Sequence, residues 1–167
     1  MMSYETILIG NDHGGIELKQ CLLAHLARRG ISADNIGSDT EQIVRYPIYA
    51  EKVAGAVSRR AVRRGILICS TGIGMSIIAN KFIGVRASLC TSVHMGKMTR
   101  AHNDSNLLCL GGKITDPTEA LAIVDAWLDT PFEGGRHCLS LDLIREAEAR
   151  LLRPVKPGAS IQEIPSL

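Results

Sequence analysis

Short apolar runs alternate with longer amphipathic segments along most of this chain, and this alternation is the feature that most limits its fold. Several of the short runs are rich in Ile, Val and Leu and end in polar or glycine-rich turns, which is typical of strands covered on both faces. Strands are predicted over residues 4–10, 31–36, 65–69, 84–90 and 107–110. The alternation predicts an α/β fold, a three-layer α/β/α Rossmann-like arrangement around a five-stranded parallel sheet.

Segments with apolar residues at helical spacing separate these strands. Helices are predicted over residues 16–29, 46–64, 75–81, 93–101, 117–128 and 139–152, and a polar turn over 102–106. Proline lies in the first turn of two of these helices, and Asp116 is placed to cap one of them. Residues 1–153 are therefore expected to form a single domain, and the proline-containing segment 154–167 an extended or disordered tail.

The composition excludes several classes of function. The chain has 167 residues, of which 46% are hydrophobic, enough for the core of one domain. A formal net charge of +2 predicts neither nucleic-acid binding nor membrane attachment, and we see no signal peptide or membrane-spanning run. The five cysteines are scattered, with no C-x-x-C pair, which indicates a reducing cytoplasm, free thiols and no metal site. No feature calls for a cofactor.

The segment 65–76 is the strongest candidate for a functional site. Its strand ends in Cys69, and a turn with Gly72 and Gly74 leads into a helix. Glycines let the backbone approach a ligand closely, and the first amides of a helix favour an anion. The same field favours a thiolate, so Cys69 is a candidate base or nucleophile. The alternative is an inert buried cysteine before an ordinary turn, since free cysteine is among the most buried residue types.

This glycine loop does not match three better-known anion-binding loops. No Gly-Lys-Ser/Thr follows at the spacing of a Walker loop. The third glycine of a dinucleotide fingerprint is replaced by Ile77, and the loop follows a strand in the middle of the chain. Met75 stands where a thiol phosphatase would need arginine. With these three excluded, the segment is interpreted as an anion-binding turn that begins next to a thiol.

Ligands bind beyond the carboxyl ends of the strands in open parallel sheets. We therefore expect one edge of the sheet to collect the polar residues Asp12, His13, Cys69, Thr71, His102 and Asn103. Such a set suits proton transfer next to a carbonyl, with a thiol base and donors for the enediolate oxygen. Thr71 and the amides of Gly72 and Gly74 are the candidate donors, and His102 could open a sugar ring.

A phosphorylated substrate would also need cationic groups, for which His13 and Arg136 are candidates. Each polar residue has an ordinary alternative interpretation. His13 could be a turn residue that bonds only to backbone, the segment 102–104 a turn and strand cap, and Arg136 a solvated helix start. His25 is expected at the surface, whereas Cys21, Cys90 and Cys109 are expected in or near the core.

Taken together, the motifs of this chain resemble those of the type B ribose-5-phosphate isomerases, over roughly residues 4–150. These enzymes belong to a sugar-phosphate isomerase family that also holds allose- and galactose-6-phosphate isomerases. The motifs that carry the resemblance are Asp12-His13-Gly14-Gly15, Tyr46-Pro47-x-Tyr49-Ala50, Gly65-Ile66-Leu67-Ile68-Cys69-x-Thr71-Gly72-x-Gly74, Ala79-Asn80-Lys81-x-x-Gly84-Val85-Arg86-Ala87, His102-Asn103-Asp104-x-Asn106 and Glu133-Gly134-Gly135-Arg136-His137.

The resemblance implies an isomerase of carbohydrate metabolism, as in the pentose phosphate pathway, without a metal or other cofactor. It implies that Cys69 is the base that moves a proton between C1 and C2. Thr71 and the glycine loop would hold the enediolate, and Asp12 and Tyr46 would contact the sugar.

The resemblance also implies a cytoplasmic homodimer or tetramer with active sites at the subunit interface. His102 would open the sugar ring, with Asn103 nearby, and both would reach in from the other subunit. His13 and Arg136 would hold the phosphate.

Two departures from the family pattern bear on the substrate. Lys113 stands where many relatives have a phosphate-contacting arginine, and Ser140 where many have a further arginine. Lysine keeps the charge but loses the bidentate fork. Ribose 5-phosphate and ribulose 5-phosphate remain the first expectation. The alternatives are another sugar phosphate, such as erythrulose 4-phosphate or allose 6-phosphate, a non-catalytic sugar-phosphate-binding module, or a thiol hydrolase. His102-Asn103 argues against the galactose-6-phosphate branch.

Overall fold

A computed structural model describes residues 4–151, and within that range the chain forms one parallel sheet. The strands lie in the order β2-β1-β3-β5-β4, and every neighbouring pair is parallel. Their bounds are β1 (Ile7–Asn11), β2 (Ala33–Asn35), β3 (Gly65–Cys69), β4 (Ala87–Leu89) and β5 (Leu107–Gly111). The predicted five-stranded parallel α/β fold is confirmed.

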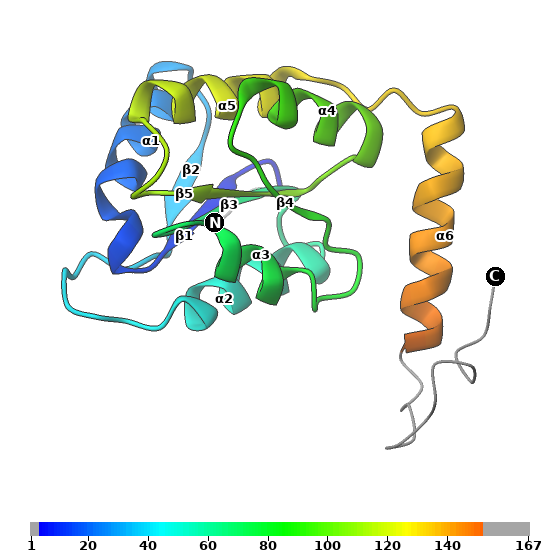
Figure 1. Ribbon diagram of the computed structural model, residues 1–167, viewed down its shortest axis with the longest axis horizontal. Helices are drawn as coiled ribbons and strands as arrows, with labels where there is room; N and C mark the ends of the chain where they lie inside the picture. The colour runs from blue at the N-terminus through cyan, green and yellow to red at the C-terminus, as the bar shows by residue number, and fades with distance from the viewer. Residues whose placement is uncertain (1–3, 152–167) are drawn as a thin grey trace.

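Helices cover both faces of the sheet (Figure 1). The helices α1 (Ile16–Arg28), α4 (Val93–Asn103) and α5 (Pro117–Asp129) form one layer, and α2 (Tyr46–Ser58) and α3 (Ile73–Ala79) form the other. A short 3-10 turn, η1 (His13–Gly15), joins β1 to α1. Asp116 caps α5 as predicted, because its carboxylate accepts hydrogen bonds from the amides of Thr118 and Glu119 at 2.8 and 3.4 Å.

The strands divide their side chains between two cores, one on each side of the sheet. In β1, Ile7 and Ile9 pack with α1 and α5, whereas Leu8 packs with α2. All residues of β1, β3 and β5 are buried. This double burial explains why these strands read as continuous apolar runs rather than as alternating ones.

Several boundaries differ from the predicted ones. Helix α2 ends at Ser58 instead of residue 64, because Arg60 takes a left-handed conformation with φ +58°. Helix α4 continues to Asn103, so the first part of the predicted polar turn 102–106 is helical, and Asp104 (φ +45°) ends the helix. The segment 154–167, predicted as a tail, lies outside the described residues.

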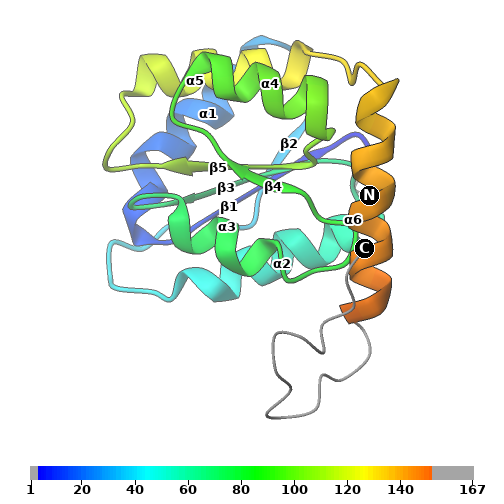
Figure 2. The same ribbon diagram turned by 45° about the vertical axis from the view of Figure 1, so that its right-hand side comes forward.

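The last helix, α6 (Arg136–Leu151), lies beside the sheet and outside both helical layers (Figures 1 and 2). Leu141 is its buried contact with the rest of the chain, whereas Leu139, Leu143 and Ile144 are exposed. The carboxylate of Glu148 accepts a hydrogen bond from the Gly84 amide at 3.0 Å. The helix thus presents an apolar surface that the described chain does not cover. Among residues 4–151, no helix is both long and apolar enough to cross a membrane.

Candidate active site

Three loops meet at the carboxyl edge of the sheet, after β1, β3 and β5. The Gly112 amide donates to the Cys69 carbonyl at 2.8 Å, and the Lys113 amide donates to the Ser70 carbonyl at 3.0 Å. Gly14 packs so closely on Ser70 that a β-carbon would collide with it. These contacts hold the three loops in one surface, as the alternation of strands and helices predicts.

Cys69 is the last residue of β3, and only 5% of it is exposed. Its Sγ accepts a hydrogen bond from the Gly72 amide at 3.1 Å. Gly72 has φ +76°, and a β-carbon there would lie 2.6 Å from Leu89 Cδ1, so the loop needs glycine at this position. An amide directed at the sulfur stabilises negative charge on it. The geometry therefore suits a thiol that acts as a base.

Asp12 and His13 lie in the turn after β1, which is hydrogen-bonded to the end of β3. The Asp12 amide donates to the Ile68 carbonyl at 3.1 Å, and the Asp12 carboxylate accepts from the Gly14 amide at 2.8 Å. His13 Nδ1 accepts from the Val44 amide at 3.3 Å. A neutral imidazole that accepts at Nδ1 carries its proton on Nε2. His13 is therefore placed as a hydrogen-bond donor through Nε2.

Tyr46 and Thr71 complete this edge. A β-carbon on Gly74 would lie 2.7 Å from Tyr46 Cζ, so the tyrosine ring packs directly on the glycine loop. Thr71 Oγ1 accepts from the Ile73 amide at 3.4 Å, and Lys113 is exposed. The edge therefore brings together eight of the predicted site residues, which are Asp12, His13, Tyr46, Cys69, Thr71, Gly72, Gly74 and Lys113.

The prediction that His102 and Asn103 share this edge is wrong for a single chain. Both residues end α4 and precede β5, so they lie at the amino end of that strand. Cys69 is paired with Gly111, the last residue of β5, whereas Leu107 is the first. Four steps along a strand span roughly 13 Å. In one chain, the thiol and this imidazole therefore lie at opposite edges of the sheet.

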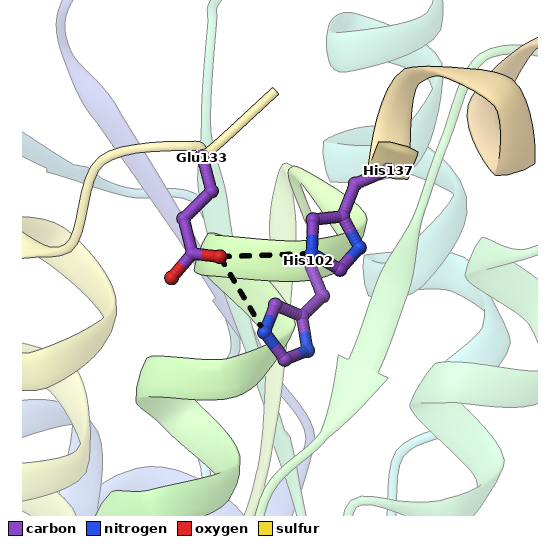
Figure 3. A group of neighbouring side chains, drawn as sticks. All are labelled: His102, Glu133 and His137. Atoms are coloured by element: carbon purple, nitrogen blue, oxygen red, sulfur yellow. Dashed lines mark ion pairs between the residues drawn. The ribbon is translucent and has the colours of Figure 1, made fainter. Parts of the chain in front are cut away.

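A second polar cluster forms at the amino edge, around His102 (Figure 3). The carboxylate of Glu133 lies 3.7 Å from Nε2 of His102 and 3.6 Å from Nε2 of His137. The two imidazole rings are stacked, with centroids 4.3 Å apart and planes inclined by 12°. Arg136 precedes His137 at the start of α6. Three polar side chains, those of His102, Glu133 and His137, therefore gather from the end of α4, the segment that joins α5 to α6 and the start of α6.

Sequence reasoning assigned roles to His102 and Arg136 in this cluster but not to Glu133 or His137. The signal was present, because Glu133 and His137 are four residues apart around two glycines. Gly134 and Gly135 have φ +67° and +58°, and they turn the chain so that both side chains face His102. The ligand atoms of the three residues lie within 4.8 Å of one another. In-plane lone pairs of nearly parallel rings do not converge on one ion, so this arrangement fits a shared carboxylate better than a metal centre.

The cysteines and His25 differ in part from their predicted positions. Cys90 and Cys109 are buried as predicted, whereas Cys21 is exposed, as is Cys138. His25 is not a solvated surface residue, because its Nε2 lies 2.6 Å from the Asp125 carboxylate and its side chain is 16% exposed. Burial raises the pKa of Cys90 to about 11, and burial also raises the pKa of Cys109.

Alkylation by iodoacetamide near pH 8 is expected to distinguish these thiols by their reaction rates. Cys21 and Cys138 should react first, because both are exposed. Cys90 and Cys109 should stay unmodified in the folded protein, since they are buried and an elevated pKa leaves almost no thiolate. Peptide mass spectrometry after a timed reaction measures the order, with urea-unfolded protein as the control in which all five thiols react. Rapid labelling of Cys109 in folded protein would contradict this.

Comparison with known proteins identifies the family of this chain. Residues 7–144 match the Ribose/Galactose Isomerase family. The chain is 43% identical to ribose-5-phosphate isomerase B of Escherichia coli, over 86% of this chain and 97% of that protein.

Two solved structures extend the likeness to the fold. Ribose-5-phosphate isomerase B of Clostridium thermocellum superposes with a TM-score of 0.85 at 44% identity, covering 87% of this chain and 98% of that one. The Mycoplasma genitalium enzyme, solved with bound ribulose-5-phosphate, has a TM-score of 0.84 at 36% identity, covering 89% and 99%. The chain therefore belongs to the ribose/galactose isomerase family.

Proposed function

We propose that this protein is an aldose–ketose isomerase that interconverts a phosphorylated sugar pair, ribose 5-phosphate and ribulose 5-phosphate first among them. The observation that carries this proposal is the position of the Cys69 thiol at the carboxyl edge of the sheet. Its Sγ accepts a hydrogen bond from the Gly72 amide at 3.1 Å. The ribulose-5-phosphate bound to the Mycoplasma genitalium relative supports the substrate class.

The reaction needs only proton transfers. Cys69, as thiolate, removes the proton from C2 of the open-chain aldose, and electrons move to the carbonyl oxygen at C1 to give a cis-enediolate. Return of the proton from the Cys69 thiol to C1, with transfer of the C2 hydroxyl proton to the oxyanion on O1, gives the ketose and restores the thiolate. Thr71 and the amides at the start of α3 stabilise the developing oxyanion. Asp12 and Tyr46 contact the sugar hydroxyls, and no redox change of the enzyme is required.

A second copy of the chain completes the site in this proposal. His102, Asn103 and Arg136 lie at the amino edge of the sheet, away from Cys69, so another subunit must supply them. His102 then opens the furanose ring, while Arg136 joins His13 at the phosphate. The exposed apolar side chains of α6, Leu139 and Leu143 among them, support a homodimer or a dimer of dimers, since such surfaces mark interaction sites.

The cellular setting follows from the cysteines. Cys21, Cys69, Cys90, Cys109 and Cys138 are all free thiols in the structure. Free thiols persist in reducing compartments. We therefore propose that the protein acts in the cytoplasm.

The residues that bind the phosphate bear on which sugar phosphate is the substrate. Lys113 is exposed beside Ser70, and Ser140 is exposed on α6. Lysine binds phosphate as a point charge without the bidentate geometry of arginine. Ribose 5-phosphate remains the first candidate, and a tetrose or hexose phosphate the second.

Isomerisation of aldose phosphates with four to six carbons, followed by NMR, tests the function. The wild-type protein should convert at least one of them, and Cys69→Ala should convert none. Highest activity on ribose 5-phosphate would mean that Lys113 compensates for the arginine that Ser140 replaces. Highest activity on a tetrose or hexose phosphate would assign a different substrate within the same chemistry. Failure to convert any of them would refute the isomerase proposal and favour a binding module.

His102→Ala is expected to slow cyclic substrates more than open-chain ones, by about a hundredfold, because only the cyclic forms need ring opening by general acid–base catalysis. The comparison uses a furanose-forming pentose phosphate against erythrose 4-phosphate, which cannot close a furanose ring because its O4 carries the phosphate. Asn106→Ala, in the next turn, serves as a control for local folding. Equal losses on both substrates would remove the ring-opening role.

A further inference from the structure

One buried cation has no role in the chemistry described so far. Lys19, in α1, is 1% exposed. Its Nζ donates to the Ser38 carbonyl at 2.6 Å and to the Asp39 carboxylate at 2.5 Å. The hydrogen bond from the Lys19 ammonium, together with one from Asn35, lowers the pKa of the Asp39 carboxyl. Burial of an ammonium group costs free energy unless it is paired and hydrogen-bonded, so this arrangement calls for an explanation.

The ammonium fixes the start of the loop that spans residues 37–45. The Ser38 carbonyl accepts a second hydrogen bond from Asn11 Nδ2 at 2.9 Å, and the Ser38 amide donates to the Asn11 carbonyl at 2.9 Å. Gly37 packs on Asn11 with no room for a β-carbon. Lys19 and Asn11 therefore tie the loop to the carboxyl end of β1, one residue before Asp12.

The far part of the same loop reaches two residues of the candidate site. The Val44 amide donates to His13 Nδ1 at 3.3 Å. Two residues later α2 begins at Tyr46, whose ring packs on Gly74. The position of the loop thus decides whether His13 has a donor on Nδ1, and this donor leaves the imidazole proton on Nε2.

We propose that Lys19 is a positioning residue for substrate binding, which acts through the 37–45 loop to hold His13 as a neutral Nε2–H donor toward the substrate phosphate. The inference rests on the proposed function for its ligand, a sugar phosphate. In this proposal His13 binds the phosphate as a hydrogen-bond donor, whereas its sequence context predicted a cationic group. The cationic part then falls to Lys113 and Arg136.

The tautomer of His13 tests this proposal without any substrate. Protonated and unprotonated imidazole nitrogens give well separated ¹⁵N resonances, and comparison with His13→Gln assigns the His13 signals. In the wild-type protein Nε2 should be protonated and Nδ1 not. Lys19→Met should fold, because the Ser38 carbonyl keeps its Asn11 donor and the Asp39 carboxylate, whose side chain is 74% exposed, stays solvated when the ammonium is removed. In this variant His13 should lose its single tautomer.

Kinetics give the second readout. Lys19→Met should raise KM about tenfold with kcat within about twofold, because misplaced binding groups weaken binding more than chemistry when they act only on the phosphate. Lys97→Met, the same substitution at an exposed position of α4, should change neither the tautomer nor KM. A folded Lys19→Met protein with unchanged His13 resonances and unchanged KM would overturn the proposal, as would a wild-type His13 protonated on Nδ1.

A matched pair at His13 keeps the test decisive if Lys19→Met does not fold. Glutamine places an amide nitrogen near the position of Nε2, whereas asparagine places one near Nδ1. His13→Gln should therefore raise KM less than His13→Asn, and the reverse order would contradict the assignment. Absence of all isomerase activity in wild-type protein would refute the proposed function, but the tautomer measurement would still decide the role of Lys19.

Discussion

Replacement of Cys69 by alanine is expected to lower turnover by about a thousandfold or more, because general base catalysis by a positioned side chain contributes about that much. The variant should fold, since Cys69 ends β3 and alanine leaves the strand and its Gly72 turn intact. Turnover is measured by NMR on the preferred aldose phosphate, and folding by circular dichroism and thermal unfolding. Exchange of the C2 hydrogen with solvent, a signature of the enediolate, should disappear with turnover.

Cys109→Ala provides the matched control. Cys109 is fully buried on β5, in the same apolar cluster as Cys69, and burial raises its pKa. Its loss should cost some stability through a small cavity, while turnover stays near the wild-type level. If Cys69→Ala kept a tenth of wild-type activity, another group would have to be the base. If both variants were equally inactive, packing of the cluster rather than the Cys69 thiol would be responsible.

The sheet and its loop edge could be predicted because their signals are local. β1, β3 and β5 are continuous apolar runs, and the glycines after β3 mark a turn that no other residue type fits at Gly72. The direction of the strands then places the turns after β1 and β3 at one edge. Cys69 and Asp12 were found together for this reason.

The edge at which His102 lies was predicted wrongly, although the predicted order of elements, with the turn 102–106 before the strand 107–110, already indicated the amino edge. The sequence His102-Asn103-Asp104 looks like a polar turn, but the helix continues through Asn103 until the left-handed Asp104 ends it. His102 was predicted at the carboxyl edge, but its segment precedes β5 and does not follow it, so it lies at the amino edge. Glu133 and His137 were missed as partners of His102, since only the fold of the two-glycine turn brings them to α4.

The burial of Lys19 was also invisible in the sequence. Lysine on an amphipathic helix is usually solvated, and neither Ser38 nor Asp39 is close to it along the chain. Only the packing of α1 under the 37–45 loop makes this ammonium a buried donor. Hydrogen bonds of this kind join segments whose contact cannot be predicted from the hydrophobic periodicity of the sequence.

The strongest test of the interfacial site is complementation between two inactive chains. Cys69→Ala and His102→Ala proteins, each purified alone, should show little turnover of a furanose phosphate. After they are mixed under conditions that exchange subunits, activity should rise to about a quarter of the wild-type level. Random exchange makes about half of the dimers mixed, and each mixed dimer has one site with both wild-type residues.

The physical reason is the separation of the two residues within a chain. Cys69 lies at the carboxyl end of β3, whereas His102 lies before the amino end of β5, roughly 13 Å away along the sheet. If both residues act in one reaction, Cys69 of one subunit therefore meets His102 of another subunit. Mixing Cys69→Ala with a Cys69→Ala/His102→Ala double variant should recover nothing, because no site then has the thiol. If the two single variants failed to complement while mass spectrometry showed mixed dimers, His102 would have to act within its own chain or outside the reaction.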